Sequence, residues 1–194
     1  MKKLLALLLL LFLCVSPALA DQSRVIDEAD VLTADEEFRL EQAITQIREQ
    51  HQFDVVLLTK ASIDGKIARY YAADYYDNNS FGYGNSHDGI ILLLVTGGGV
   101  GNREYSVVLT GKGRDVFTDE VLSKIEDDIL PFLKQSNYSV AQRRFIEDVE
   151  YELSIQPQQK QIFNLEVDKT AKLLVSVLSG IIHSIAVYCV IGGI

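Results

Sequence analysis

The chain has 194 residues, of which 48% are hydrophobic and 23% charged, and its formal net charge is −9. This length suits one compact domain, although the apolar residues gather at the two ends of the chain. The acidic balance argues against electrostatic binding to nucleic acid or to anionic membrane surfaces, and it is compatible with binding a cation.

The first twenty residues have the composition of an export signal. Lys2 and Lys3 form a basic start, residues 4–13 are almost uninterrupted apolar sequence, and Ala18-Leu19-Ala20 is a small-x-small cleavage site. We expect residues 1–20 to be a secretory signal peptide, cleaved before Asp21, with an uncleaved membrane anchor as the alternative. Cleavage leaves 16 basic and 27 acidic residues, a net charge of −11, on a domain outside the cytoplasm.

The other apolar segment, residues 173–194, contains no Asp, Glu, Lys or Arg. As a helix it would be about 33 Å long, enough to cross a hydrocarbon core of about 30 Å. It predicts a C-terminal transmembrane helix, with a buried helix as the alternative. Residues 156–172, which are rich in glutamine, are expected to link this anchor to a folded domain over residues 21–155.

The two cysteines, Cys14 and Cys189, both fall in the terminal apolar segments. The expected domain therefore has no disulfide, no thiolate nucleophile and no cysteine metal site. Its stability has to come from its hydrophobic core.

The pattern of the central region predicts alternating helices and strands. Thr33 and Glu36 form a potential capping box at the start of an amphipathic helix over residues 34–50. A second helix is expected over 66–78, with Ile67, Tyr70, Tyr71 and Tyr75 on its buried side. Helices over 119–130, stopped by Pro131, and over 138–153 follow, and strands are predicted at residues 53–59, 89–96 and 104–110, with a glycine-rich turn at 97–101.

This order of elements predicts an α/β/α sandwich with a small mixed central sheet. The first two predicted strands are expected to be parallel, through a right-handed crossover, and the last antiparallel to its neighbour. The loops 79–88 and 111–118 then lie at one edge of the sheet. The first helix is expected to begin at the opposite edge.

The shared edge holds the residue types that could carry chemistry. Asp88 and Asp119 could offer oxygen ligands to calcium or magnesium. Lys112 and Arg114 could stabilise negative charge on a phosphate, and His87 could transfer a proton. The alternative is a set of surface turns in which Asp and Asn bond to the local backbone. The sequence lacks Gly-x-Ser-x-Gly and His-x-x-x-His motifs, which disfavours a serine hydrolase and a zinc hydrolase.

Several motifs, taken in order, resemble the TPM domain family. They are residues 25–33 (Val-Ile-Asp-Glu-Ala-Asp-Val-Leu-Thr), 81–84 (Phe-Gly-Tyr-Gly), 88–94 (Asp-Gly-Ile-Ile-Leu-Leu-Leu), 105–113, 117–119 and 129–131, with Tyr138 and Phe145 following. The resemblance covers about residues 23–153. It implies an α/β/α sandwich, and the combination of signal peptide, domain and membrane segment is similar to that of bacterial members.

The resemblance also implies candidate functions. Plant thylakoid-lumen members are described as acid phosphatases that bind divalent metal through aspartates, and an animal member as a receptor accessory protein. Carried over by motif, Asp27, Asp30, Asp88 and Asp119 are the implied metal ligands. The predicted topology brings Asp88 and Asp119 together but places Asp27 and Asp30 at the other edge.

Two hypotheses follow for the function. In one, aspartates hold divalent ions for phosphomonoester hydrolysis, with Asp88, Asp119 and Lys112 as the candidate catalytic residues. In the other, the domain is a non-catalytic, membrane-tethered binding or accessory module for a membrane or cell-envelope protein. The sequence favours the second, because it shows no combination of nucleophile, base and orienting group.

Overall fold

The computed structural model describes residues 22–97 and 104–191, without the side chains of residues 157–162 and 179–191. The predicted signal peptide and residues 98–101 of the glycine-rich turn lie outside the described residues. In chain order the elements are β1 (Val25–Asp27), α2 (Ala34–His51), β2 (Asp54–Lys60), α3 (Ala68–Asn78), β3 (Gly89–Val95), β4 (Glu104–Thr110), α4 (Gly113–Val116), α5 (Asp119–Lys134) and α6 (Tyr138–Ile191).

The four strands form one mixed sheet in the order β1-β2-β3-β4. β2 and β3 are parallel and β4 is antiparallel to β3, which confirms both predicted pairings. β1 was not expected from the sequence, because three residues are too few to show an alternating pattern. It pairs in parallel with β2, with Val25 opposite Leu57.

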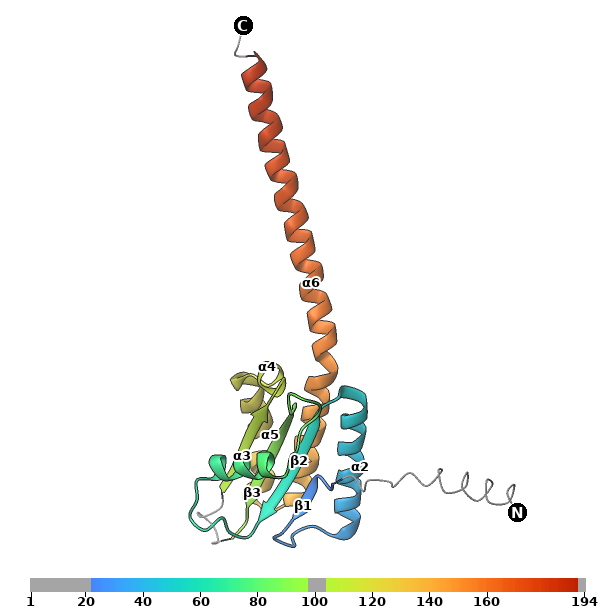
Figure 1. Cartoon of the computed structure of the whole chain (residues 1–194), viewed down its shortest axis with the longest axis vertical. Coiled ribbons are helices and arrows are strands. Elements are labelled where there is room, and N and C mark those ends of the chain that lie inside the picture. The colour runs from blue at the N-terminus through green and yellow to red at the C-terminus, as the bar shows by residue number, and fades with distance from the viewer. Residues whose placement is uncertain (1–21, 98–103, 192–194) are drawn as a thin grey trace, which may run out of the picture.

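Helices cover both faces of the sheet and create two hydrophobic cores (Figure 1). On one face α2, α5 and α6 pack on the strands through side chains such as Ile44, Ile129 and Phe145. On the other face α3 packs through Ala72 and Tyr76. β2 and β3 are buried on both sides, as expected for continuous apolar strands at the centre of a sandwich.

The predicted capping box begins α2. Thr33 Oγ1 accepts a hydrogen bond from the Glu36 backbone N–H, and the Glu36 carboxylate accepts one from the Thr33 N–H at 2.9 Å. The helix ends at His51 and is capped by Gln52, whose left-handed backbone has φ 52°. That turn leads the chain directly into β2.

The prediction of the buried side of α3 was wrong for Ile67 and Tyr70. Their exposed fractions are 64% and 66%, and the residues that face the sheet are Ala68, Ala72 and Tyr76. Two alanines on this face let the helix approach the strands closely. Tyr76 lies over Gly89, where a Cβ atom would be only 2.0 Å from the tyrosine hydroxyl.

Proline does not stop α5, contrary to the sequence prediction. Pro131 lies inside the helix, which continues to Lys134. The ring removes one backbone hydrogen bond near the end of the helix, where fewer bonds remain to be lost. Continuing the helix buries Leu133 on the same side as Ile129, which offsets that loss.

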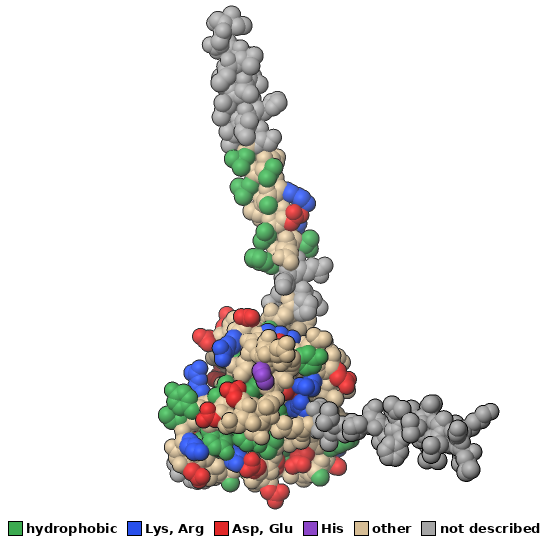
Figure 2. Space-filling model, viewed as in Figure 1, with side chains coloured by type: hydrophobic (Ala, Val, Ile, Leu, Met, Phe, Trp, Pro, Cys, Tyr) green, Lys and Arg blue, Asp and Glu red, His purple; other side chains and the backbone are tan. Residues whose placement is uncertain are grey.

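The last helix continues well past Leu153, where the sequence pattern predicted its end. α6 runs unbroken through the expected linker and extends away from the domain (Figure 1). Hydrophobic side chains are exposed along this part (Figure 2). They include Phe163 and Leu174. Among the described residues, no helix has a stretch long and apolar enough to span a membrane. Most of the predicted span, residues 173–194, lacks described side chains.

Candidate functional site

The two loops predicted to share an edge of the sheet, residues 79–88 and 111–118, do meet there. We call this region, at the start of β3 and the end of β4, the loop edge. Gly89, at the start of β3, pairs with Thr110 at the end of β4, so the residues before and after them are neighbours. Asp88 Oδ1 accepts a hydrogen bond of 2.7 Å from the Lys112 backbone N–H. The carboxylate predicted as a metal ligand thus joins one loop to the other.

Glycine is required where these loops touch. Gly111 has φ +53°, and a Cβ atom on it would lie 2.0 Å from Asp88 Oδ1. Gly82 has φ +108°, and a Cβ atom there would lie 2.5 Å from the Cα of His87. At these two positions neighbouring loop residues therefore lie too close for any residue with a side chain.

The basic residues of the edge make contacts within the protein. Lys112 Nζ donates to the carbonyl of His51 at 2.8 Å and lies 5.9 Å from the centre of the Phe53 ring. Arg114 Nε donates to the carbonyl of Leu109 at 3.3 Å. His87 Nδ1 lies 2.8 Å from the carbonyl of Phe81, inside its own loop. These contacts hold the loops in place.

A buried ion cluster that sequence reasoning missed lies directly behind this edge. Asp54 is fully buried, and its Oδ1 lies 3.1 Å from Arg24 Nε and 3.0 Å from Arg48 Nη1. Its Oδ2 accepts a 2.8 Å hydrogen bond from the Gly82 N–H. Arg48 in turn lies over the Tyr83 ring at 5.3 Å. The sequence signal was an aspartate in an otherwise apolar strand, which requires a buried cationic partner.

Asp119 belongs to the same edge of the molecule as Asp88. Phe117, two residues before Asp119, packs on Phe53 with a ring-centroid distance of 5.7 Å. Asp119 then begins α5 behind Thr118, whose hydroxyl caps the helix. No hydrogen bond or ion pair within the described chain joins the two aspartates.

Asp27 and Asp30 lie at the other end of the strands, as the predicted topology implied. Asp27 pairs with Thr59 near the end of β2, whereas Asp88 is next to Gly89 at the start of β3. Asp27 Oδ2 accepts hydrogen bonds of 2.7 Å from the backbone N–H groups of Val31 and Leu32. Asp27 therefore shapes the turn before α2, in which Asp30 has φ 54°.

The four aspartates are consequently not one site. Along β2 the two pairs are separated by about 20 Å, given a rise of about 3.3 Å per residue. Within residues 22–97 and 104–191, no three His, Cys, Asp or Glu side chains converge in a way that could hold a metal ion.

The side of α3 away from the core carries exposed Ile67 and Tyr70, and half-buried Tyr71 and Tyr75 lie next to them against the core; we call these four residues the tyrosine face. Tyr71 and Tyr75 stack with ring centroids 6.4 Å apart, and burial raises the pKa of Tyr75. Lys66 Nζ lies 5.5 Å from the centre of the Tyr71 ring. A surface groove of about 510 Å³ runs along this face.

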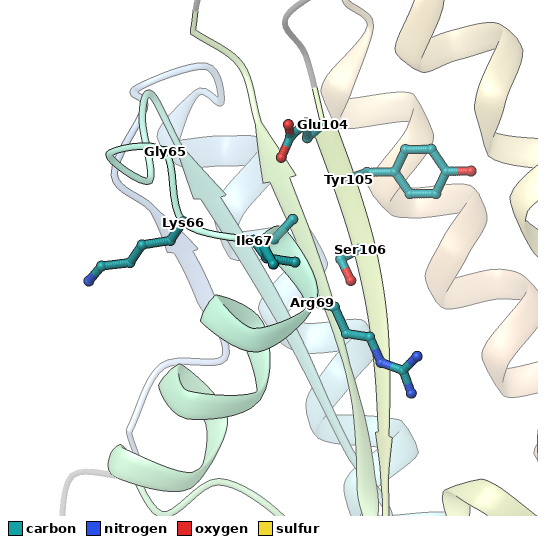
Figure 3. A pocket seen from close by; sticks show the side chains of 8 residues that line it. Gly65, Lys66, Ile67, Arg69, Glu104, Tyr105 and Ser106 are labelled. Carbon is teal, nitrogen blue, oxygen red and sulfur yellow. The ribbon is translucent and has the colours of Figure 1, made fainter.

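A second groove, of about 570 Å³, lies between the start of α3 and the start of β4. Its lining includes Ile67, Arg69 and Ser106. Figure 3 shows Ile67 directed toward the strands and the Arg69 guanidinium beside β4, whereas Lys66 points away. Arg69 forms no hydrogen bond or ion pair with any residue of the described chain.

Solved structures with the same fold come from several bacteria. An N-terminal domain from P. gingivalis is 24% identical, with a TM-score of 0.59, and the match covers 70% of this chain and 85% of that one. The N-terminal domain of cg2496 from Corynebacterium glutamicum is 18% identical, with a TM-score of 0.55 and coverages of 73% and 86%. The BA42 protein from Bizionia argentinensis is 20% identical, with a TM-score of 0.53 and coverages of 63% and 81%.

Among curated proteins, the sequence has no significant match. The family model of the TPM domain matches residues 25–151, from the first residue of β1 into α6. This match includes every strand of the sheet, the loop edge and the tyrosine face. The chain therefore belongs to the TPM domain family.

Proposed function

We propose that this chain is a non-catalytic binding module outside the cytoplasm, which acts as an accessory to a membrane or cell-envelope protein. The observation that carries the proposal is the tyrosine face. Ile67 and Tyr70 expose about two thirds of their surface on a helix whose other side is buried in the core. A protein partner would cover such a face and remove its apolar surface from water.

The chemistry of this face is typical of protein interfaces. Tyrosine contributes a large contact area and a hydroxyl group while losing little conformational entropy on binding. Lys66 and Arg69 lie beside it on a chain whose overall charge is negative. An apolar centre with a polar rim is the usual arrangement in a binding surface.

The terminal segments support a location outside the cytoplasm. Residues 1–20 have the basic start, apolar run and small-residue cleavage site of an export signal. Residues 173–194 have no charged side chain, and we propose that they anchor the domain in the membrane. Fractionation of cells that produce the full chain tests both points: recovery of the whole protein in the cytoplasm would contradict export, and recovery in a soluble fraction would contradict the anchor.

Position-specific photocrosslinking tests the binding function. A photoreactive phenylalanine analogue placed at Tyr70 should form an adduct in cells, and the same analogue at Tyr151 should not. Tyr151 is a matched control, because it is 61% exposed but lies on α6 outside the tyrosine face. Adding Ile67→Ser should remove the adduct from position 70. Equal adducts at positions 70 and 151, or none at position 70, would contradict the proposal.

We also propose that the loop edge binds a divalent cation, calcium or magnesium. Asp88 and Asp119 belong to this edge, and backbone carbonyls and water would have to complete the coordination, as calcium permits. Calorimetric titration of calcium and magnesium into the wild type and Asp88→Asn tests this assignment. An affinity that Asp88→Asn leaves unchanged would exclude Asp88 as a ligand.

The second candidate function is a metal-assisted acid phosphatase. It is favoured by the position of Asp88 beside Lys112 at the loop edge, where the Asp88 carboxylate accepts a hydrogen bond from the Lys112 backbone N–H. Hydrolysis of a phosphomonoester at acidic and neutral pH is the direct assay. Activity that disappears in both Asp88→Asn and Asp119→Asn would establish this function and overturn the non-catalytic proposal.

A further inference from the structure

β4 is an edge strand whose one charged residue, Glu104, stands at its start. Its outer side receives no backbone hydrogen bond from any described residue, and its sequence, Glu-Tyr-Ser-Val-Val-Leu-Thr, contains no proline, lysine or arginine. Its register with β3 continues without a bulge from Glu104 to Thr110. Soluble proteins usually block an exposed edge with such residues or with a bulge.

The other edge of the same sheet is protected in a different way. β1 has only three residues, from Val25 to Asp27, and very short edge strands pair poorly with other chains. β4 is seven residues long, the same length as the central strands β2 and β3. Within the described residues, the sheet therefore has a short edge strand on one side and a long, unpaired one on the other.

The contacts of β4 indicate which backbone groups are available. The Leu109 carbonyl accepts a hydrogen bond from Arg114 Nε, which places this carbonyl on the side away from β3. Peptide groups alternate in direction along an antiparallel strand, so the N–H and C=O groups of Val107 and Tyr105 point the same way. An added strand would find its hydrogen-bonding partners there.

The groove between α3 and β4 lies beside this open edge. It offers an exposed apolar side chain in Ile67 and a cation in Arg69, which has no partner in the described chain. A strand that paired with β4 would direct alternate side chains toward this groove. An apolar residue would pack on Ile67, and an acidic residue would pair with Arg69.

We propose that β4 accepts an extended, acidic segment of a partner protein as a fifth strand of the sheet. Strand addition of this kind obtains affinity from main-chain hydrogen bonds and specificity from pockets for alternate side chains. The inference rests on the proposed binding function and defines the chemistry of the partner. It adds a contact surface that continues from the tyrosine face through Ile67, which lines both grooves.

A second copy of this chain fits the edge less well than a separate partner. Antiparallel pairing of β4 with its own copy requires a two-fold axis perpendicular to the sheet, which reverses every direction in the sheet plane. α6 leaves the domain roughly along the strands (Figure 1), so the two α6 helices would point in opposite directions. Two copies anchored in one membrane through α6 could not pair in this way.

The probe for a test is a displayed library of random peptides somewhat longer than β4, selected on the protein purified as the cell produces it. We expect enriched peptides to alternate apolar and acidic residues. Val107→Pro, which removes an outward N–H group, and Arg69→Glu should each weaken their binding about tenfold or more. Arg39→Glu, an exposed charge reversal on α2, is the control and should have no effect.

Amide hydrogen exchange supplies a readout specific to strand addition. Bound peptide should slow exchange at Tyr105 and Val107, which a peptide bound elsewhere would not do. If circular dichroism shows that Val107→Pro does not fold, Ser106→Lys is the substitute variant. It places a charge on the side of β4 that faces the groove.

The other outcomes overturn the inference. The first is that no peptide is enriched relative to selection on an unrelated protein. The second is peptide binding that none of Val107→Pro, Ser106→Lys and Arg69→Glu weakens. The third is amide exchange at Tyr105 and Val107 that bound peptide leaves unchanged. A dimer in sedimentation experiments that becomes monomeric in Ser106→Lys would assign the edge to a second copy instead. Crosslinking from position 70 reports on the tyrosine face, which Val107→Pro and Ser106→Lys leave unchanged. An adduct that persists in these variants would separate failure of this inference from failure of the proposed function.

Discussion

Arg24 and Asp54 form a buried ion pair, with 3.1 Å between Nε and Oδ1, that joins the segment before β1 to the start of β2. Arg48 approaches the same oxygen from α2, and the Gly82 N–H bonds the other oxygen. One carboxylate therefore holds together three regions that are distant in sequence: the segment before β1, the junction of α2 and β2, and the loop at Gly82. The buried cluster therefore fixes the loop at Gly82 from behind, as Asp88 fixes the loop at Lys112.

Removing the charge of Asp54 should destabilise the domain strongly. Asp54→Asn removes the buried negative charge that Arg24 and Arg48 both contact, and we expect a loss of about 3–5 kcal/mol of unfolding free energy. Urea unfolding measures it, with Asp74→Asn on the exposed side of α3 as the matched control. Amide exchange at Gly82 should also become faster. A loss no larger than that of the control would contradict this account of the cluster.

The two glycines of the loop 82–88 should respond differently to alanine. Gly82→Ala forces a Cβ atom against the His87 backbone, and we expect a loss of about 2–4 kcal/mol. Gly84 also has positive φ, +65°, but nothing lies within 4 Å of its Cβ position, so Gly84→Ala should cost only about 1 kcal/mol. Thermal unfolding of both variants is the measurement. Similar losses of stability would show that the positive φ alone, and not the contact with His87, determines the cost of alanine.

The orientation of α3 can be tested with two of its tyrosines. Tyr76 is fully buried against Phe81, with ring centroids 5.8 Å apart, so Tyr76→Ala should cost about 3–5 kcal/mol. Tyr70→Ala should change the unfolding free energy by no more than about 0.5 kcal/mol, because its side chain is exposed. Denaturant titration compares the pair. A large loss at Tyr70 would indicate that the tyrosine face is part of the core.

Asp148 should make stability depend on pH. Burial, and next the nearby charge of Asp128, raise its pKa from 3.8 to about 6, and its Oδ2 is buried without a hydrogen-bond partner in the described chain. The folded state therefore favours the protonated acid, so stability should fall as pH rises from about 4 through about 6.

Asp148→Asn removes this dependence. We expect the variant to be more stable than the wild type at pH 8, by the order of 1 kcal/mol because the group is partly screened by solvent, and equally stable at pH 4. Urea unfolding at both pH values is the measurement. An equal effect of Asp148→Asn at the two values would rule out titration of Asp148 as the cause.

The helices and the central strands could be predicted because their signals are local. The capping box at Thr33 and the apolar runs of β2 and β3 depend on neighbouring residues, and the structure confirms them. The meeting of the loops before Gly89 and after Thr110 followed from strand direction alone. The prediction that α5 ends at Pro131 was wrong, because the burial of Leu133 outweighs the loss of one backbone hydrogen bond.

The sequence by itself determined the alternation of helices and strands, the family resemblance that its match to the TPM domain bears out, and the grouping of charged residues into loops. Only the tertiary structure decided that Ala68 and Ala72, rather than Ile67 and Tyr70, face the sheet. It also decided that Asp54 pairs with Arg24, and that β4 has an open edge. The reason is physical: burial and pairing depend on which surfaces meet across the fold, and a one-dimensional pattern shows which residues are apolar or charged without showing what lies opposite them.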